Sequence, residues 1–424
     1  MWSLELNDTE ISLAHDLDVI YQQPGVAVVL EGGVLFGDAA LEQARLHPRQ
    51  AHTQYWQRLS ADPISVSGRA IKNHADLVYQ HLLEIKRLSN LPNNEPVFVA
   101  VPSNTSSEQL SLLLGIADEA SIQVSTFADL AVATASTLSV PGHCTFVDNG
   151  FHRTVLTRLE INGSVSRTSF SEAAETGFQA LVEGWIDAVA DLFVHETRFD
   201  PLRIADTEQQ VFNQVLKNVA SRDNEFLVEV SHAGETRRVM VKRSLLATKS
   251  HQRFEALLQH MGEPTTVVLS HRIARVPGLT DILREAGHEL YVVESHAVFS
   301  AAMAYKNSSA HDEDGVSFVT QLASTGSHDE PAGYERLRPT HLLHGATAVP
   351  LSDLISDQNQ SQSTTRNRGF RIELDGSGYR VLPETEAKVE INGVTIDTSA
   401  SAAAGDIIRS DAEEFQLIRV TQHG

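Results

Sequence analysis

The segment FVDNGFHRTVL contains residue types that could bind phosphate or a metal ion. Two apolar residues lead into Asp148, Gly150 follows two positions later, and a β-branched run resumes after the turn. In a strand–turn–strand of this kind the carboxylate can bind Mg²⁺, and glycine lets backbone amides surround phosphate oxygens. The turn continues, however, with Phe151, His152 and Arg153, where small residues would be needed. The segment therefore indicates either a nucleotide site or the remains of one.

The composition excludes several classes of protein. The chain has 424 residues, too many for one core, so two or three domains are expected; 42% of residues are hydrophobic and 21% charged, as in ordinary globular proteins. A formal net charge of −22 argues against nucleic acid as a partner. No stretch approaches the ~20 apolar residues of a membrane span, and no signal peptide is expected. With one cysteine, Cys144, no intramolecular disulfide forms, and a cytoplasmic location is expected.

Two parts of the chain predict the same order of secondary structure. In each, β-hairpins come first, and a helix, an apolar strand, a second helix, a short strand and a small-residue helix follow. Residues 97–136 in the first part correspond to residues 265–305 in the second. The predicted helices are 76–88, 106–120, 129–136, 177–198, 206–220, 251–261, 278–287 and 296–305, and the predicted hairpins include 4–14 with a turn at Asn7-Asp8, 26–37 with a turn at Gly32-Gly33, the pair joined at Asn162-Gly163, and 226–241.

The character of the sequence changes beyond Lys306. The segments NSSAHDEDG and SDQNQSQSTTRNR are polar and are typical of linkers or loops. Beyond Arg368 the pattern predicts only short strands separated by turns, which indicates a small all-β module. The predicted fold class is therefore α/β with a β appendix.

The repeated order and the quoted motif together resemble the nucleotide-binding domain of the Hsp70 chaperones, within the actin/Hsp70/sugar-kinase superfamily. The resemblance covers roughly residues 1–306 and includes GVLFGDAALEQARLHPRQ. It implies a two-lobed, duplicated actin-like ATPase fold with mixed five-stranded sheets and flanking helices. Lobe I would be residues 1–142, and lobe II residues 143–306 with a subdomain at about 222–262. Residues 307–424 would be a linker and a β-sandwich-like module similar to forkhead-associated domains, in place of the chaperones' peptide-binding domain.

In that family, two hairpin turns hold the nucleotide phosphates and Mg²⁺ between the lobes. A pair of glycines admits the adenine and ribose, while a lysine and acidic groups position the attacking water. These residue types suit phosphoryl transfer, because that reaction depends mostly on positioning and on neutralising charge.

The matching residues of this chain depart from the family's pattern. Asp8 lies in the first phosphate turn, where its carboxylate would repel phosphate oxygens. Gln57 replaces the lysine, and Arg272 places a guanidinium where the ribose would pass. The first turn reads Glu5-Leu6-Asn7-Asp8-Thr9 instead of aspartate-any-glycine-threonine-threonine; Ala128, with Asp129 beside it, replaces a glutamate; Phe151, His152, Arg153 and Val155 alter the second turn; Val211 stands beside the adenine; and His271 and Arg272 replace the glycine pair.

The retained positions and the substituted ones each have two interpretations. The predicted cleft residues are Asn7, Asp8, Thr9, Asp148, Asn149, Gly150, His271 and Arg272. Asp148 either caps a turn or touches Mg²⁺ through water. His152 and Arg153 are exposed turn residues by default, or they bind an anion, and the pair that replaces the glycines either fills the pocket or forms an anion site. Cys144 is expected to be a buried small hydrophobe and Trp56 a core anchor.

Two functions remain open from the sequence. The first is an Hsp70-like pseudo-ATPase that acts as a protein-binding scaffold or regulatory module with a protein partner, because a missing catalytic group alone costs ~10²–10⁴-fold in rate. The alternative is an ATP-binding chaperone or ATPase of the same family with slow hydrolysis, and a third option is a cleft for another small anion. We expect no cofactor, with Mg-ATP or ADP as the alternative. The appendix is not expected to bind phosphopeptides, although Ser361, Arg366 and Arg368 lie in one of its loops.

Overall fold

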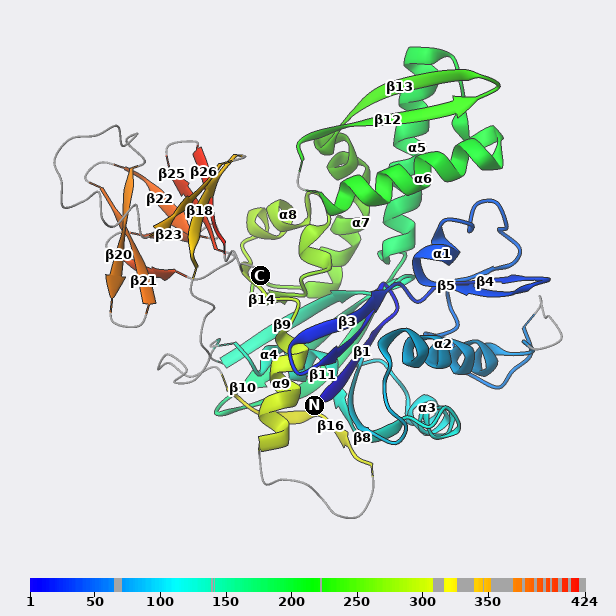
Figure 1. Ribbon diagram of the computed structural model, residues 1–424, viewed down its shortest axis with the longest axis horizontal. Helices are drawn as coiled ribbons and strands as arrows, with labels where there is room; N and C mark the ends of the chain where they lie inside the picture. The colour runs from blue at the N-terminus through cyan, green and yellow to red at the C-terminus, as the bar shows by residue number, and fades with distance from the viewer. Residues whose placement is uncertain are drawn as a thin grey trace. The chain divides into compact units, whose positions relative to one another are not determined.

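The computed structural model divides the chain into two compact units, Met1–His328 and Asp329–Gly424 (Figure 1). The protein is a mixed α/β protein, which confirms the predicted class at that level. Among the described residues, no helix combines the length and the apolar character needed to cross a membrane. The structure describes residues 1–64, 71–138, 140, 142–221, 223–307, 316–325, 339–345, 347–351, 369–375, 378–384, 387–391, 394–396, 399–402, 406–410 and 413–418. Ser361, Arg366, Arg368 and the two polar segments predicted as linkers, apart from Asn307, lie outside these residues.

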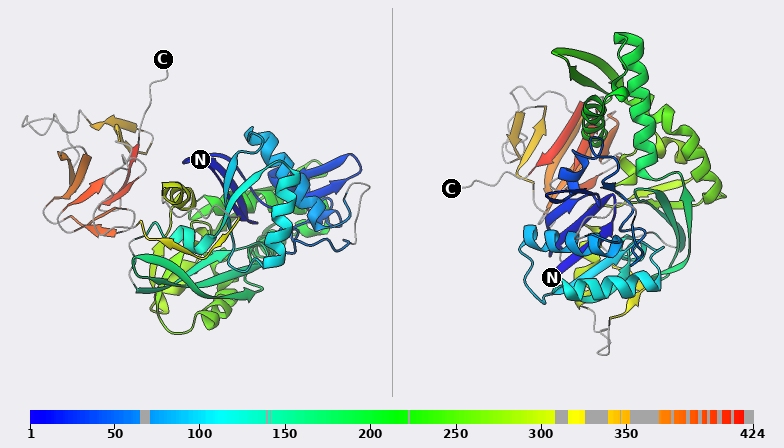
Figure 2. Two further views of the ribbon diagram at one scale, coloured as in Figure 1. Left: turned by 90° about the horizontal axis from the view of Figure 1, so that it is seen from below. Right: turned by 90° about the vertical axis from the view of Figure 1, so that its right-hand side faces the viewer.

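The first six-stranded sheet of unit 1 has the order β16-β8-β7-β1-β2-β3. Its strands are β1 (Trp2–Asn7), β2 (Glu10–His15), β3 (Asp18–Gln23), β7 (Pro96–Val101), β8 (Gln123–Asp129) and β16 (Phe318–Val319). β1, β2 and β3 are antiparallel, whereas β1, β7 and β8 are parallel. Helices α2 (His74–Ser89) and α3 (Ser107–Glu119) lie side by side against this sheet and bury their apolar stripes on it (Figure 2).

The second six-stranded sheet has the order β15-β14-β9-β10-β11-β17. Its strands are β9 (Gly142–Asn149), β10 (Arg153–Ile161), β11 (Ser164–Ala174), β14 (Thr266–Leu269), β15 (Glu289–Val292) and β17 (Gln321–Ala323). Here β9, β10 and β11 are antiparallel, and β9, β14 and β15 are parallel. Five strands of each sheet thus follow the same spatial order and the same directions.

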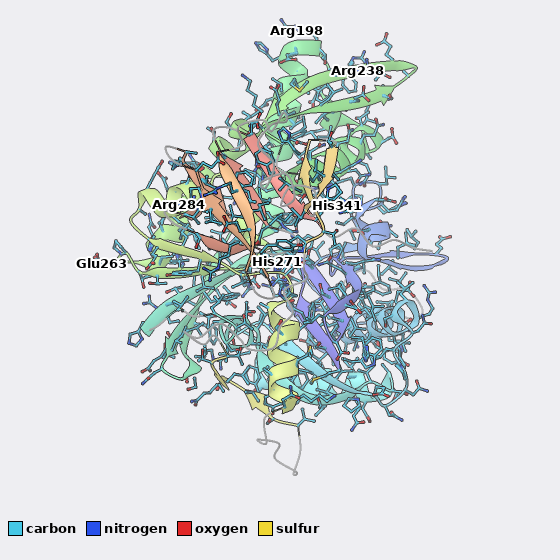
Figure 3. The ribbon with its side chains drawn as sticks, turned by 60° about the vertical axis from the view of Figure 1, so that its left-hand side comes forward. Arg198, Arg238, Glu263, His271, Arg284 and His341 are labelled. Carbon is cyan, nitrogen blue, oxygen red and sulfur yellow. The ribbon has the colours of Figure 1, made fainter. Side chains whose placement is uncertain are left out.

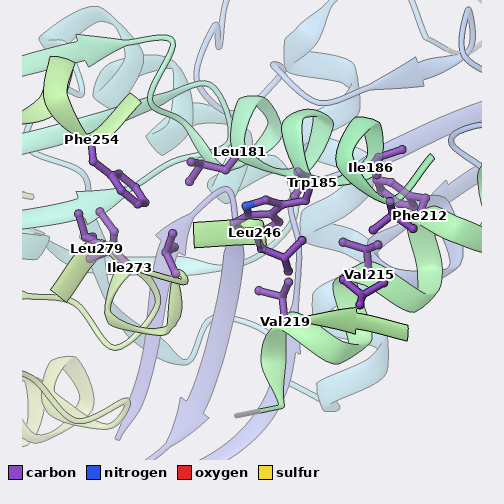
Figure 4. Packing of buried hydrophobic residues seen from close by; sticks show 14 of the residues in the cluster. Leu181, Trp185, Ile186, Phe212, Val215, Val219, Leu246, Phe254, Ile273 and Leu279 are labelled. Atoms are coloured by element: carbon purple, nitrogen blue, oxygen red, sulfur yellow. The ribbon is translucent and has the colours of Figure 1, made fainter. Parts of the chain in front are cut away.

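A large apolar cluster covers the outer face of the second sheet. Trp185 on α5 is fully buried at its centre and donates from Nε1 to Ser250 Oγ at 2.8 Å (Figure 4). The elements that contribute are α5 (Phe178–Thr197), α6 (Ala205–Ala220), α7 (Arg243–Met261), α8 (Leu279–Glu285) and the hairpin β12 (Glu225–His232) with β13 (Glu235–Lys242), together with the short 3-10 turns η1 (Pro201–Arg203) and η2 (Ile273–Arg275). This cluster holds β14 and the residues after it in place.

Small side chains let the two sheets approach each other through a shared core. α4 (Leu130–Ala135) and α9 (Ala297–Asn307) pack in this core with residues of both sheets, among them Phe98, Cys144 and Phe146. Cys144 is 3% exposed, so it is the buried small hydrophobe that the sequence predicts. The alanine-rich helices are thin enough to fit where a leucine-rich helix would force the sheets apart.

A small subdomain lies beside the first sheet. It consists of β4 (Ala27–Leu30), β5 (Gly33–Phe36), β6 (Ala51–His52) and α1 (Gly37–Leu41). Leu30 pairs with Gly33, so the turn is Glu31-Gly32 and not Gly32-Gly33. The first hairpin of the chain also turns one residue later than predicted, at Asp8-Thr9, because Asn7 still pairs with Glu10. The predicted turn at Asn162-Gly163 is confirmed.

Two other sequence predictions were wrong. α7 begins at Arg243 and not at 251, since Leu246, Ser250 and Phe254 form one buried stripe along it. The polar Ser250 hid this period, although its hydroxyl donates to Leu246 O at 3.1 Å. β16 and β17 lie in the segment assigned to the linker, yet they pair with β8 and β11 at the sheet edges. The short apolar alternation in VSFVTQLA was the available signal.

The described elements of unit 2 are strands in two sheets. One sheet has the order β19-β18-β26-β25-β22-β23 and the other β20-β21-β24. Its core includes Phe415, which stacks on His344 and meets Phe370 edge-on. The strands are β18 (His341–His344), β19 (Thr347–Pro350), β20 (Phe370–Asp375), β21 (Gly378–Pro383), β22 (Val389–Ile391), β23 (Val394–Ile396), β24 (Ala400–Ala402), β25 (Ile407–Ser410) and β26 (Glu413–Ile418).

Candidate functional site

The turn between β1 and β2 meets the turn between β9 and β10. Asn7 Nδ2 donates to Asp148 Oδ2 at 2.8 Å and to Asn149 O at 3.2 Å. Thr9 Oγ1 donates to Asn149 O at 3.1 Å, and Phe151 N donates to Asp8 Oδ1 at 2.8 Å. The structure thus brings the two predicted turns together, and each turn supplies hydrogen-bond partners for the other.

Arg272 lies buried between the two sheets, with its side chain only 7% exposed. Its NH1 is 2.5 Å from Glu5 Oε1, and its NH2 is 2.8 Å from Asp148 Oδ2. The residue before it, His271, contacts Glu10 Oε1 through Nε2 at 2.6 Å. Figure 3 shows His271 well inside the outline of the molecule, and its side chain is 11% exposed. Of the two interpretations of this pair, the filled pocket agrees with these contacts.

The ionisation of this cluster follows from burial and from Arg272. Burial raises the pKa of Glu5, and the Arg272 charge opposes that rise only in part. Burial also acts to raise the pKa of Asp148, but Arg272, Ser270 and Asn7 outweigh it and hold that pKa below its usual range. The pKa of Arg272 is raised by Asp148 and Glu5 despite burial. Arg272 is therefore charged, and it neutralises carboxylates that would otherwise be isolated in the interior.

Both oxygens of Asp148 already have partners. Oδ1 accepts from Ser270 Oγ at 2.5 Å and from Asn149 N at 2.9 Å, while Oδ2 accepts from Asn7 and Arg272. A Mg²⁺ ion, or a water bound to one, would have to displace at least one of these donors. Among the described residues, no three His, Cys, Asp or Glu side chains are grouped as metal ligands. The Asp148 carboxylate as it stands does not fit a metal site.

Asp8, from the first turn, accepts a backbone hydrogen bond from the second turn. Its Oδ1 accepts from the Phe151 amide, and a Cβ added at Gly150 would lie 3.1 Å from the same oxygen. The pKa of Asp8 is raised to about 6, because burial, helped by Asp148, outweighs the lowering by the Phe151 amide, Arg153 and Arg272. The Phe151 amide is therefore occupied by a carboxylate of the chain itself.

The bulky residues of the second turn each contact residues elsewhere in the chain. Phe151 is 6% exposed and packs with Val26 and Val28 of the small subdomain. His152 Nε2 lies 2.9 Å from Thr53 Oγ1. Arg153 forms an ion pair with Glu172 and is half-buried. The default interpretation of His152 and Arg153 as exposed turn residues was wrong, because long-range contacts hold this turn against residues 26–57.

A cavity of about 90 Å³ lies under the two turns. It is lined by Leu6, Asn7, Asp8, Trp56, Gln57, Leu59, Val101, Pro102, Ser103, Asn104, Thr105, Gln109, Leu113, Leu130, Ala131, Phe146, Asp148, Gly150, Arg153, Val155 and Thr157. Gln57 and Val155, two positions at which the sequence departs from the pattern of the family that it resembles, are among these residues. Trp56 lines the cavity and donates from Nε1 to His81 Nδ1 at 3.2 Å, so it is more than a core anchor.

Two other predicted positions do not reach the cavity. Ala128 is fully buried in the core between the sheets, and Val211 is fully buried in the cluster around Trp185. Asp129, next to Ala128, caps α4 by accepting from Ala131 N at 2.9 Å and pairs with Arg167 at 2.7 Å. These positions are structural in this chain.

The polar residues after β7 were not predicted as site residues from the sequence. Ser103 Oγ donates to Asp129 Oδ1 at 3.0 Å and lies 2.7 Å from Thr157 Oγ1. Asn104 Nδ2 donates to Glu172 Oε1 at 2.6 Å, beside Arg153. The available signal was their place at the carboxyl end of a parallel strand, where ligands commonly bind in α/β sheets.

No protein-family model matches the chain, and no curated protein matches it. The chemistry of the site is therefore inferred from its own contacts.

Arg45 forms a second connection between the first 142 residues of unit 1 and the residues that follow them; these two parts are called the halves of unit 1. Its guanidinium lies 2.6 Å from Glu183 and 3.2 Å from Glu208, and it covers the ring of Phe212 at 4.6 Å. Gln209 adds a bond by accepting from Arg45 N at 2.7 Å. These contacts connect the segment after α1 of the small subdomain with helices α5 and α6.

Replacing Arg45 by methionine is expected to lower the free energy of unfolding by about 1 kcal/mol, because the side chain is 19% exposed and water screens its ion pairs. Urea unfolding followed by tryptophan fluorescence measures the change. Arg87, which is 66% exposed and pairs only with Glu84 in its own helix, is the control, and Arg87→Met should change little. An equal loss in both variants would contradict a role for Arg45 between the halves.

Proposed function

We propose that unit 1 is an actin-like domain of the Hsp70 type that has lost ATP hydrolysis and acts as a rigid protein-binding scaffold. The shared strand order and directions of the two six-stranded sheets support the duplicated fold. The helices between and outside the sheets fit the same interpretation. The single cysteine, which is buried, supports a reducing cytoplasm as the place of action.

The ion pairs of Arg272 are the observation that carries the loss of activity. In the family that the chain resembles, a glycine stands at the position of Arg272 and lets the nucleoside enter. The aspartate at the position of Asp148 lies in the turn that holds the phosphates and Mg²⁺. Here the guanidinium satisfies Asp148 and Glu5 in the interior. A nucleotide would have to break these buried pairs and face their carboxylates, which costs several kcal/mol.

The Asp8 carboxylate and the absence of a lysine at Gln57 support the same conclusion. Asp8 uses the amide of the second turn, and Gln57 with its amide oxygen toward Arg153 accepts from that guanidinium. Transition-state charge on a transferred phosphoryl group would therefore meet carboxylates and an already paired arginine.

Scaffolding is supported by the contacts that join the halves of unit 1. Phe151, Arg45 and Arg272 each connect residues of the first 142 positions with residues beyond them. An ATPase of this class needs lobes that open and close, whereas these contacts favour one closed arrangement. A closed body with an appended β module is suited to presenting surfaces to a partner protein.

Calorimetric titration of the full chain with Mg-ATP and with Mg-ADP tests the proposal. We expect no saturable heat up to millimolar nucleotide and no phosphate release above the rate without protein. Micromolar binding accompanied by phosphate release would contradict the proposal and favour the slow ATPase. The scaffold part is tested with the full chain as bait, followed by a titration of each purified candidate partner; the absence of any direct binding would contradict it.

A further inference from the structure

The cavity under the two turns has an apolar body and one polar end. Leu59, Leu113 and Phe146 are among its apolar walls, while Asp8, Asn104 and Arg153 supply polar groups. A concave, mostly apolar site with a few convergent polar groups is the usual form of a small-molecule site. An anion in this cleft is one option that the sequence leaves open, and the charges around the cavity decide which ligand it can accept.

Most of the donor groups at the polar end already have partners in the chain. Arg153 donates to Glu172 and to Gln57, and Asn104 Nδ2 donates to Glu172. The hydroxyls of Ser103 and Thr157 bond to each other, and Ser103 donates onward to Asp129. The remaining N–H groups of Arg153 and Asn104 lie beside the Glu172 carboxylate, whose negative charge disfavours an anion there.

Acceptors remain at the same end. Asp8 has one oxygen on the Phe151 amide, and no described residue donates to the other, Oδ2. Among the described residues, the carboxylates of Asp148 and Glu172 each form an ion pair with an arginine, Arg272 or Arg153, whereas Asp8 forms none. The unpaired charge of Asp8 therefore favours a cation.

Gly25 lies between the backbone of Asp8 and the indole ring of Trp56, and both Asp8 and Trp56 line the cavity. A Cβ at Gly25 would lie 2.7 Å from Trp56 Cδ1 and 3.2 Å from Asp8 Cα, and Gly25 N donates to Asp8 O at 2.8 Å. The bond from Trp56 Nε1 to His81 fixes the indole from the other side. An indole ring attracts ammonium groups, so the cavity wall and the carboxylate favour the same charge.

We propose that this cavity binds a small primary ammonium compound, with the ammonium group on Asp8 Oδ2 and a short alkyl body against Leu59, Leu113 and Phe146. The volume of about 90 Å³ sets the size. Since an apolar cavity of about 150 Å³ accepts benzene, this one has room for roughly four heavy atoms. The inference rests on the proposed function in one respect, namely that no nucleotide takes the cleft.

Propylammonium chloride is the probe, with propanol and sodium acetate as neutral and anionic ligands of the same number of heavy atoms. Saturation-transfer NMR on the full chain, at constant ionic strength and pH 7.5, measures the dissociation constants. We expect a dissociation constant on the order of 1 mM for propylammonium, within the ceiling for so few atoms, and binding at least tenfold weaker for the other two. Equal binding of propanol, preference for acetate, or no binding of propylammonium at 50 mM, a trial excess of about 50-fold over that constant, would each overturn the proposal.

Asp8→Asn tests the contact directly. It keeps an oxygen for the Phe151 amide but removes the charge, so the dissociation constant of propylammonium should rise at least tenfold while circular dichroism stays unchanged. Asp118→Asn, on the exposed side of α3, should leave binding as it is. An unchanged affinity in Asp8→Asn would refute the assignment. Mg-ATP binding, measured separately, would contradict the proposed function, whereas missing ammonium selectivity without ATP binding contradicts only this inference.

Discussion

Replacing Arg272 by methionine is expected to lower the free energy of unfolding by about 3–5 kcal/mol. The substitution keeps an aliphatic stem but leaves two carboxylates without their cation: Glu5, which is 2% exposed, and Asp148, whose side chain is 8% exposed. An uncompensated charge in the interior costs more than the pair contributes, which is why the loss of one partner is so large. Urea unfolding measures it, and the three tryptophans, Trp2, Trp56 and Trp185, all report on unit 1.

A control and a rescue separate the buried pairs from arginine chemistry in general. Arg284 is 64% exposed and lies 3.8 Å from Asp281, so Arg284→Met should stay within about 0.5 kcal/mol of the parent. Combining Arg272→Met with Glu5→Gln and Asp148→Asn removes all three charges and should recover at least half of the loss. A loss below about 1 kcal/mol for Arg272→Met would mean that the guanidinium can leave the cleft, and the proposed loss of nucleotide binding would then lack its support.

The strands and helices of unit 1 could be predicted where one local pattern dominates. VFVAVP and TTVVLS contain no interior charge, as strands buried on both faces require, and both lie in parallel positions of their sheets. The turn at Asn162-Gly163 was predictable because those two residue types favour the required backbone. α7 was predicted too short, since a serine in its buried stripe imitates a surface position.

The composition of the candidate site was only partly predictable. The resemblance to the Hsp70-type domain pointed to Asn7, Asp8, Asp148 and Arg272 as neighbours, and the structure brings them together. What each residue does there depends on partners far away in sequence: Asp148 and Arg272 are 124 residues apart. No local pattern shows that a guanidinium will find two buried carboxylates.

The same reason explains why Phe151 looked misplaced in its turn. Its apolar partners, Val26 and Val28, come more than a hundred positions earlier in the chain. A large side chain in a tight turn is unfavourable when the turn is exposed, but it contributes apolar burial when another subdomain covers it. Phe151 therefore stabilises the contact between the second turn and the small subdomain.

Asp8→Asn is expected to raise the free energy of unfolding by roughly 2 kcal/mol at pH 7.5. Burial raises the pKa of Asp8 from 3.8 to about 6 in the folded protein, where Asp148, Arg153 and Arg272 face it. A carboxyl whose folded pKa lies above its unfolded value destabilises the fold when ionised. That penalty is fully present above about pH 6, falls to about half near pH 5, and vanishes below pH 3.8.

The pH dependence of the gain identifies its cause. If desolvation of the Asp8 charge is responsible, the difference between Asp8→Asn and the parent shrinks as the pH is lowered from 7.5 to 5, because the parent becomes protonated and its penalty disappears. Asp118→Asn, which replaces an exposed carboxylate on α3, should show no such trend. A gain that stays constant with pH would point to altered packing, and a loss at pH 7.5 would mean that the Asp8 charge stabilises the turn.

The same variant loses the ammonium site, so higher stability together with lost propylammonium binding would show that Asp8 is kept charged at a cost to the fold.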